Sequence, residues 1–137
     1  YITAYFAAEE TVSLYRGDHV LIHAAAGGVG TALVQLLKRK GCVIFGTAGS
    51  EEKMEYLREL GVDYPINYRE VDYQTEVEKL GFGRKLDATF NPIGGDYVKK
   101  DFKLLGPGGR LVLYGASKMT EARGNIIKML KLLFGFG

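Results

Sequence analysis

The sequence predicts an α/β fold: a Rossmann-like, doubly wound parallel sheet with five strands in the order 3-2-1-4-5. Five short runs rich in β-branched and aromatic residues alternate with segments of helical periodicity, which is the pattern of a parallel sheet covered by helices. The first run leads directly into a glycine-containing loop that opens onto a helix, as in nucleotide-binding βαβ units. Together these observations predict a domain that binds a nucleotide.

The predicted strands are short runs bounded by turns or by helical segments. A turn at residues 16–18 precedes the first strand. In chain order the strands are HVLIHA at 19–24, VIFGT at 43–47, YPIN at 64–67, LDATFN at 86–91 and RLVLYG at 110–115. No internal repeat interrupts this order.

Apolar residues recur at helical spacing in two segments between the strands. They are Val29, Leu33, Leu36 and Leu37 after the glycine loop, and Met54, Leu57 and Leu60 after the second strand. Such stripes predict helix faces that pack against the sheet. Further helices are expected at residues 2–14 and at 123–134, an apolar segment that carries two lysines.

Capping residues mark the ends of two predicted helices. Ser50 can cap a helix whose first turn holds two glutamates, and Gly61 follows its last turn. Likewise Asp72 can cap a helix over 73–80 that ends at Gly81. These signals fix the limits of the second and third connections of the sheet.

Composition excludes several classes of protein. With 137 residues, 47% of them hydrophobic and 25% charged, the chain is that of one globular domain with a sizeable core. Its 18 basic and 16 acidic residues are scattered, which gives no footprint for nucleic acid. No run reaches the roughly 18 apolar residues of a membrane-spanning helix.

The single cysteine, Cys42, lies in an apolar run and is expected to be a small core residue. It cannot form an internal disulfide, and neither it nor His19 and His23 has the spacing of a closed metal site. We expect a reduced, cytoplasmic setting. Since the sequence lacks an initiator Met and ends in FGFG, we also expect residues 1–137 to be the coenzyme-binding domain of a longer chain, with its substrate domain absent.

The loop after the first strand is a degenerate GxGxxG motif in which Ala25, Gly27 and Gly30 take the three glycine positions. Gly27 lets the backbone approach a pyrophosphate, and Gly30 lets the helix pack closely on the strand. The helix N-terminus adds free N–H donors and a positive dipole. The alternative is a tight strand-to-helix turn that binds no ligand.

The end of the second strand indicates which dinucleotide is bound. NAD-binding domains place an acidic residue about 20 residues after the glycines, where it accepts hydrogen bonds from the ribose 2′-OH. Here Ala48 stands in that region, Ser50 offers a hydroxyl, and Lys53 places a cation in the first turn of a helix. Alone, Lys53 could be an ordinary surface lysine, but together these residues favour NADPH.

Longer motifs resemble a known family. AAAGGVG, FGTAGSEEK, YPINYRE, NPIGGD and GPGGRLVLYGAS are similar to the quinone oxidoreductase branch of the medium-chain dehydrogenase/reductases. Within that zinc-free branch, the chain looks most like homologues of the synaptic-vesicle membrane protein, the vesicle amine transport protein. The resemblance covers nearly the whole sequence, and it implies a nicotinamide coenzyme and no zinc.

The resemblance also implies positions for the coenzyme contacts. Pyrophosphate contacts map to residues 27–30, and contacts with the 2′-phosphate and adenosine map to Ser50, Lys53 and Tyr68. For Thr3 and Tyr114, core packing or helix capping is the alternative. In full, the expected cofactor-binding residues are Gly27, Gly28, Val29, Gly30, Ser50, Lys53, Tyr68, Thr3, Pro92, Ile93, Tyr114, Gly115 and Ala116.

The reaction that the resemblance implies is hydride transfer from NADPH to a quinone or another conjugated carbonyl compound. No residue of this chain is expected to be catalytic: Ser117 has no histidine in its motif, Asp87 and Asp96 flank a strand and a loop, and the two histidines are expected to be packed or solvent-facing. The groups that polarise the carbonyl would belong to the absent domain.

Two expectations concern partners. The family's sixth strand follows the region where this chain stops, so residues 110–115 would form an open edge that associates with a second copy or is covered by the C-terminal helix. A rival hypothesis is a non-catalytic nucleotide-binding module of a vesicle- or membrane-associated protein, in which IIKMLKLLF at 126–134 contacts a membrane or a partner. The alternative for that segment is packing within its own protein.

Overall fold

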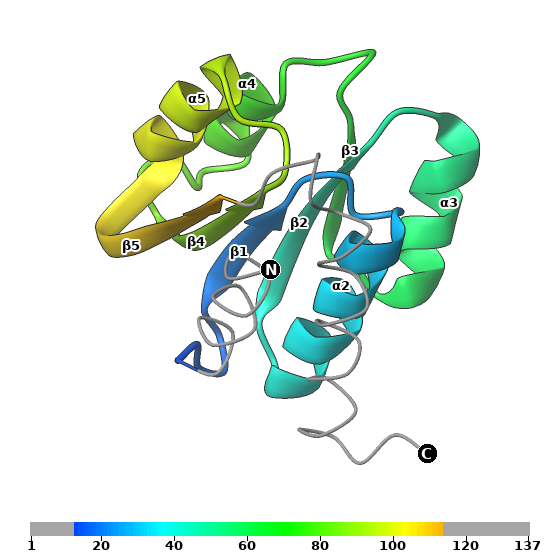
Figure 1. The fold of residues 1–137 in the computed structure, drawn as a ribbon, viewed down its shortest axis with the longest axis horizontal. Coiled ribbons are helices and arrows are strands. Elements are labelled where there is room, and N and C mark those ends of the chain that lie inside the picture. The colour runs from blue at the N-terminus through cyan, green and yellow to red at the C-terminus, as the bar shows by residue number, and fades with distance from the viewer. Residues whose placement is uncertain (1–12, 114–137) are drawn as a thin grey trace.

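Five parallel strands form a sheet in this computed structural model, which describes residues 13–113 (Figure 1). The strands are β1 His19–Ile22, β2 Val43–Ala48, β3 Tyr64–Asn67, β4 Leu86–Asn91 and β5 Leu105–Leu113. Their order is β3-β2-β1-β4-β5, so the predicted topology is confirmed. The strand order reverses between β1 and β4, and open α/β sheets bind ligands beyond the carboxyl ends of the strands at such a point.

Four helices connect the strands and cover both faces of the sheet. They are α2 Gly28–Lys40, α3 Glu51–Leu60, α4 Tyr73–Lys79 and α5 Asp96–Leu104. In Figure 1, α2 and α3 lie to one side of the sheet, and α4 and α5 lie to the other. Because neighbouring residues of a strand point to opposite faces, Val20 and Ile22 join the core beneath α2, whereas Leu21 joins the core beneath α4 and α5.

The predicted apolar stripes form the core of the α2 side. Val29, Leu33, Leu36 and Leu37 are all buried, as are Met54 and Leu57 of α3, while Leu60 is half-buried. Cys42 is buried in the same cluster, as expected. Burial raises the pKa of its thiol to about 11, with a smaller contribution from the charge of Asp18.

Both predicted helix caps are present. The Ser50 Oγ accepts a hydrogen bond from the Lys53 amide at 3.2 Å, and the Asp72 Oδ2 accepts one from the Thr75 amide at 3.0 Å. Gly61 ends α3 in the left-handed conformation, with φ of 96°. The helix after Asp72 ends at Lys79, one residue earlier than predicted.

The last strand begins earlier than the sequence predicts. β5 starts at Leu105, where it pairs with Leu86, and its pairing then shifts so that Arg110 lies opposite Ala88. The intervening Gly-Pro-Gly-Gly segment bulges out of the ladder, because proline has no amide to donate and Gly108 has a φ of 76°. The prediction located the regular pairing at 110 but missed the two-part strand.

Other predictions differ in smaller ways. β1 ends at Ile22 rather than at residue 24, since the chain turns there with a positive φ at Ala24. Asp96 begins α5 instead of flanking a loop, and Asp87 lies within β4. Residues 13 and 14 are not helical, and the rest of the predicted helix at 2–14 and all of 123–134 lie outside the described residues. Within residues 13–113, no helix is long and apolar enough to cross a membrane.

Candidate functional site

The loop between β1 and α2 is a tight turn held by backbone hydrogen bonds. The Gly27 amide donates to the Ala24 carbonyl at 3.0 Å, and the Ala25 amide donates across to the Thr47 carbonyl on β2, also at 3.0 Å. Gly27 then caps α2 without a side-chain hydrogen bond, and no acidic residue occupies the first turn. The amides of residues 28–30, in the first turn of α2, have no acceptor inside the helix, which makes them available to an anion.

The two glycines of this turn face different constraints. A Cβ on Gly30 would lie 2.2 Å from the Ala24 carbonyl oxygen and 2.8 Å from the Ala25 Cα, so only glycine lets α2 pack this closely on the loop. A Cβ on Gly27 would lie 3.3 Å from the same Ala24 oxygen, a contact that a small shift can relieve. The packing of α2 on the loop therefore requires glycine at position 30, whereas Gly27 lines the cleft under a weaker steric constraint.

A cleft of about 300 Å³ lies beyond the carboxyl ends of the strands, beside this loop. Segments far apart in sequence line it: the glycine loop, the end of β2, the first turn of α3, the loop after β3 and the loop after β4. Its lining residues are Ala24, Ala26, Gly27, Thr47, Ala48, Gly49, Lys53, Tyr68 and Ile93. None of them carries a carboxylate.

Two cations and a tyrosine gather at the β2 end of this cleft. Lys53 lines the cleft, and Arg69 lies beside it with its guanidinium carbon 5.8 Å from the centroid of the Tyr68 ring. A Cβ on Gly49 would lie 2.7 Å from the Tyr68 hydroxyl and 3.1 Å from the Arg69 Nε, so glycine at 49 allows both side chains to lie over the end of the strand. These two side chains bring positive charge to this end of the cleft.

Arg69 was not among the predicted site residues. It directly follows Tyr68 at the carboxyl end of β3, so a signal for it existed: strand-end loops on one edge of a parallel sheet lie together.

The structure brings some predicted site residues together and not others. Gly27, Lys53, Tyr68 and Ile93 line the cleft. Gly28, Val29 and Gly30 form the first turn of α2, and the Val29 side chain is in the core, so that only its backbone can contact a ligand. Ser50 caps α3 at the edge of the site, and Pro92 is buried next to Ile93. Thr3, Tyr114, Gly115 and Ala116 lie outside the described residues.

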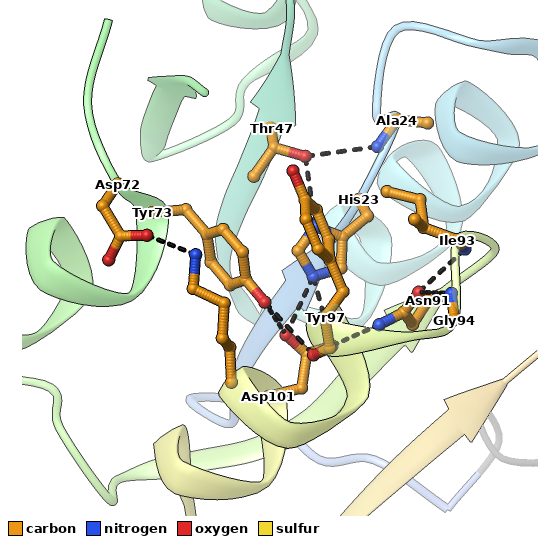
Figure 2. A network of polar contacts seen from close by, with 11 residues as sticks. His23, Ala24, Thr47, Asp72, Tyr73, Asn91, Ile93, Gly94, Tyr97 and Asp101 are labelled. Carbon is orange, nitrogen blue, oxygen red and sulfur yellow. Dashed lines mark hydrogen bonds and ion pairs between the residues drawn. The ribbon is translucent and has the colours of Figure 1, made fainter. Parts of the chain in front are cut away.

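A buried polar network lies beneath the cleft, centred on the carboxylate of Asp101 in α5 (Figure 2). The His23 Nε2 lies 2.9 Å from Asp101 Oδ1, and both side chains are fully buried. Tyr73 donates its hydroxyl to the same oxygen at 2.7 Å, and the Asn91 Nδ2 donates to Oδ2 at 3.0 Å. Burial, with Asp101 close by, raises the pKa of Tyr73 well above its ordinary value.

The sequence held a signal for part of this network. Leu21 pairs with Phe45 on one side and with Thr89 on the other, and these three residues share the sheet face beneath α5. Two residues further along each strand come His23, Thr47 and Asn91, so polar residues occupy the same face where three neighbouring strands end. His23 is packed, as predicted, but Asp101 and Tyr73 come from helices that strand patterns do not align.

No group of three or more His, Cys, Asp or Glu side chains is arranged to hold a metal ion within residues 13–113. His19 lies near the start of β1, where its amide donates to Asp87 at 2.8 Å and its ring contacts Phe82 at a centroid distance of 4.9 Å. The Asp87 carboxylate thus accepts a hydrogen bond from the backbone at the end of the sheet opposite the cleft.

Comparison with known proteins identifies similar sequences. Residues 28–135 match the family described as zinc-binding dehydrogenase. The chain is 38% identical over 125 residues to prostaglandin reductase 1 of Oryctolagus cuniculus, covering 91% of this chain and 36% of that protein. It is 40% identical over 133 residues to the synaptic vesicle membrane protein VAT-1 homolog of Homo sapiens, covering 96% and 33%. The chain thus spans about a third of the length of these relatives.

Solved structures agree with this placement. A 2-haloacrylate reductase matches with a TM-score of 0.76 and 34% identity, covering 88% of this chain and 39% of that one. CurA from Vibrio vulnificus, solved in complex with NADPH, matches with a TM-score of 0.72 and 29% identity, covering 96% and 41%. The resemblance inferred from the motifs, and its restriction to the coenzyme-binding part, are confirmed by these matches.

Proposed function

This chain belongs to the zinc-binding dehydrogenase family, and from that membership we propose that its cleft binds NADPH as the coenzyme part of a reductase. The cleft itself supports the proposal: a helix N-terminus without a side-chain cap and Lys53 lie at the strand ends, Arg69 is beside them, and no lining residue carries a carboxylate. Such a site suits a ligand with several phosphates.

The glycine loop fits the pyrophosphate. Gly27 has an extended backbone with φ of −78° and no side chain, so phosphate oxygens can approach the amides of residues 28–30 closely. The helix dipole adds a favourable field for the negative charge. Gly30 keeps the helix close enough to β1 for these amides to face the cleft.

The opposite end of the cleft fits a 2′-phosphate. Ala48 leaves no carboxylate to bind a ribose 2′-OH or to repel a phosphate. Lys53 and Arg69 supply positive charge, and the exposed face of Tyr68 offers a surface on which an adenine can stack. The preference for NADPH over NADH rests on this end.

For chemistry, bound NADPH supplies the hydride, and we propose a quinone or another conjugated carbonyl compound as acceptor. The chain's own residues bind and orient the coenzyme. Two similar proteins are named as reductases, one of prostaglandin and one of 2-haloacrylate, which supports reduction as the reaction class. We propose that no zinc takes part, as the motifs' resemblance to a zinc-free branch implies, and metal analysis of the purified protein tests this.

The test is turnover. The protein that contains this chain is expected to consume NADPH when a quinone or an enone is added, and to do so after treatment with a chelator. A Gly27→Val variant provides the control, because its side chain would occupy the approach to the helix amides. Absence of NADPH consumption with every such acceptor would contradict the proposed reaction.

One comparison favours a second candidate function. A relative that is 40% identical is named as a synaptic vesicle membrane protein, which is compatible with a nucleotide-binding module that acts at a membrane. Residues 126–134, proposed to make that contact, lie outside the described residues. Sedimentation with lipid vesicles separates the two candidates, since lipid binding without turnover favours the module and turnover without lipid binding favours the enzyme.

We also propose that the chain self-associates through β5. Among the described residues, β5 is an edge strand whose one neighbouring strand is β4, and an edge strand can pair with a second copy. Sedimentation equilibrium is expected to show a dimer at micromolar concentration. A monomer at every concentration would refute this association.

A further inference from the structure

We propose that Asp101 is a positioning residue that links the two loops on either side of the coenzyme cleft. This inference rests on the proposed coenzyme site and goes beyond it, because Asp101 does not line the cleft. It acts through two chains of hydrogen bonds, one to the glycine loop and one to the loop between β4 and α5 (Figure 2).

The first chain runs through His23 and Thr47. The Ala24 amide can only donate, so the Thr47 Oγ1 accepts from it, at 3.2 Å. Thr47 Oγ1 lies 3.3 Å from the His23 Nδ1, and His23 Nε2 lies 2.9 Å from the Asp101 carboxylate. In a neutral imidazole, Nε2–H donates to Asp101 and Nδ1 accepts a hydrogen bond from the Thr47 hydroxyl. Both ring nitrogens and the Thr47 hydroxyl therefore have hydrogen-bond partners.

This chain ends at a strained position. Ala24 has a φ of 53°, in the left-handed region that residues other than glycine rarely adopt. The bond from its amide to Thr47 helps to hold that conformation, from which the backbone turns into the cap of α2. The placement of the glycine loop therefore depends on the orientation of the Thr47 hydroxyl, which His23 and Asp101 fix.

The second chain runs through Asn91. Its Nδ2 donates to Asp101 Oδ2 at 3.0 Å, which fixes the orientation of the amide group. Its Oδ1 then accepts from the amides of Ile93 at 2.8 Å and Gly94 at 3.0 Å, which closes the turn after β4. Ile93 and Ala24 both line the cleft, so the Asp101 carboxylate helps to position one residue on each side of it.

A third donor to Asp101 provides a matched control. Tyr73 donates its hydroxyl to Oδ1 at 2.7 Å and also lies 3.2 Å from the Tyr97 carbonyl, but it connects to neither loop. A Tyr73→Phe variant removes a buried hydrogen bond from the same carboxylate and leaves both chains to the cleft complete. A purely structural role for Asp101 predicts the same behaviour for variants at both positions.

The test compares Asp101→Asn with Tyr73→Phe by amide hydrogen exchange and by calorimetric titration with NADPH. In Asp101→Asn, one atom that must accept becomes a donor, so we expect the amides of Ala24, Ile93 and Gly94 to exchange about tenfold faster and the NADPH Kd to rise about tenfold. In Tyr73→Phe we expect a lower Tm, whereas the exchange rates of these amides and the NADPH Kd should stay unchanged. Unchanged exchange in Asp101→Asn, or equal effects in both variants, would overturn the inference.

A second pair of variants serves if Asp101→Asn does not fold. Thr47→Val removes the hydroxyl at nearly constant shape, and Thr47→Ser retains it. We expect Thr47→Val to speed exchange at Ile93 and Gly94, on the far side of the cleft, and Thr47→Ser to restore it. If Thr47→Val speeds exchange at the Ala24 amide alone, the proposed link between the two loops is refuted. If the unaltered chain binds no NADPH, the proposed function fails, while the exchange data still decide the role of Asp101.

Discussion

Replacing each of two glycines in the same turn with alanine should separate folding from coenzyme binding. In Gly30→Ala the new methyl group meets only backbone atoms, at 2.2 Å and 2.8 Å, so no side chain can rotate to make room. Overpacking of this kind costs about 3 kcal/mol, at the upper end of the usual range. Alanine recovers about 1 kcal/mol as the better helix former.

The net loss for Gly30→Ala is therefore about 2 kcal/mol, which for 137 residues lowers Tm by roughly 7 °C. For Gly27→Ala the contact is 3.3 Å and φ is −78°, so alanine fits. The weaker cap costs about 0.5 kcal/mol, and the lower entropy of the unfolded chain offsets a similar amount, so that stability should change by less than about 0.5 kcal/mol. Its methyl group should nevertheless hinder the pyrophosphate.

The assay is thermal unfolding of both variants together with titration by NADPH. We expect Gly30→Ala to lose stability, and Gly27→Ala to keep its Tm while its NADPH Kd rises about tenfold, as for a lost charge-assisted hydrogen bond. If Gly30→Ala unfolds at the same temperature as the unaltered chain, or if Gly27→Ala is the more destabilised of the two, Gly30 is not the glycine that the packing of α2 requires.

Three further predictions concern charge and burial. Lys53→Ala should raise the NADPH Kd about tenfold and leave NADH binding nearly unchanged, with Arg69→Ala acting in the same direction; equal losses for both coenzymes would contradict this. The hydrogen bond from Lys100 holds the pKa of Asp72 below its ordinary value, so this contribution, about 0.5 kcal/mol, is complete above about pH 4 and is lost as the pH falls through the lowered pKa. Lys100 also lies over the rings of Tyr73 and Tyr97, contacts that do not depend on Asp72, so urea unfolding should show that the stability difference between Lys100→Ala and the unaltered chain is larger at pH 7 than near pH 2. Cys42, with its pKa of about 11, should react with iodoacetamide at pH 8 more than about a hundredfold faster in denaturant than in the folded chain, and similar rates would show an accessible thiol.

The sheet could be predicted from the sequence because its signals are local. The runs at 43–47, 64–67 and 86–91 each agree with the observed strands to within one residue, and Ser50 and Asp72 cap helices as expected. Hydrophobic periodicity and helix capping depend on residues that are close in sequence, and they can therefore be recognised from the sequence alone.

The parts that were missed depend on contacts between distant residues. Asp101 looks like one more charged residue among the lysines of α5, and only the packing of that helix over the strand ends places it against His23, 78 positions away in sequence. The first pairing of β5, between Leu105 and Leu86, could not be predicted because the Gly-Pro-Gly-Gly bulge separates it from the regular pairing that starts at Arg110. Arg69 follows Tyr68 at the end of β3, which was a signal in the sequence, but its position above Gly49 depends on the packing of two strand ends.

Calorimetric titration of this chain with NADPH and with NADH tests whether the β2 end of the cleft selects NADPH. Because Lys53 and Arg69 lie at the end of the cleft proposed for the extra phosphate, we expect NADPH to bind with a Kd at least about tenfold lower than that of NADH. Equal affinity for the two coenzymes, or tighter binding of NADH, would show that this end of the cleft does not select NADPH.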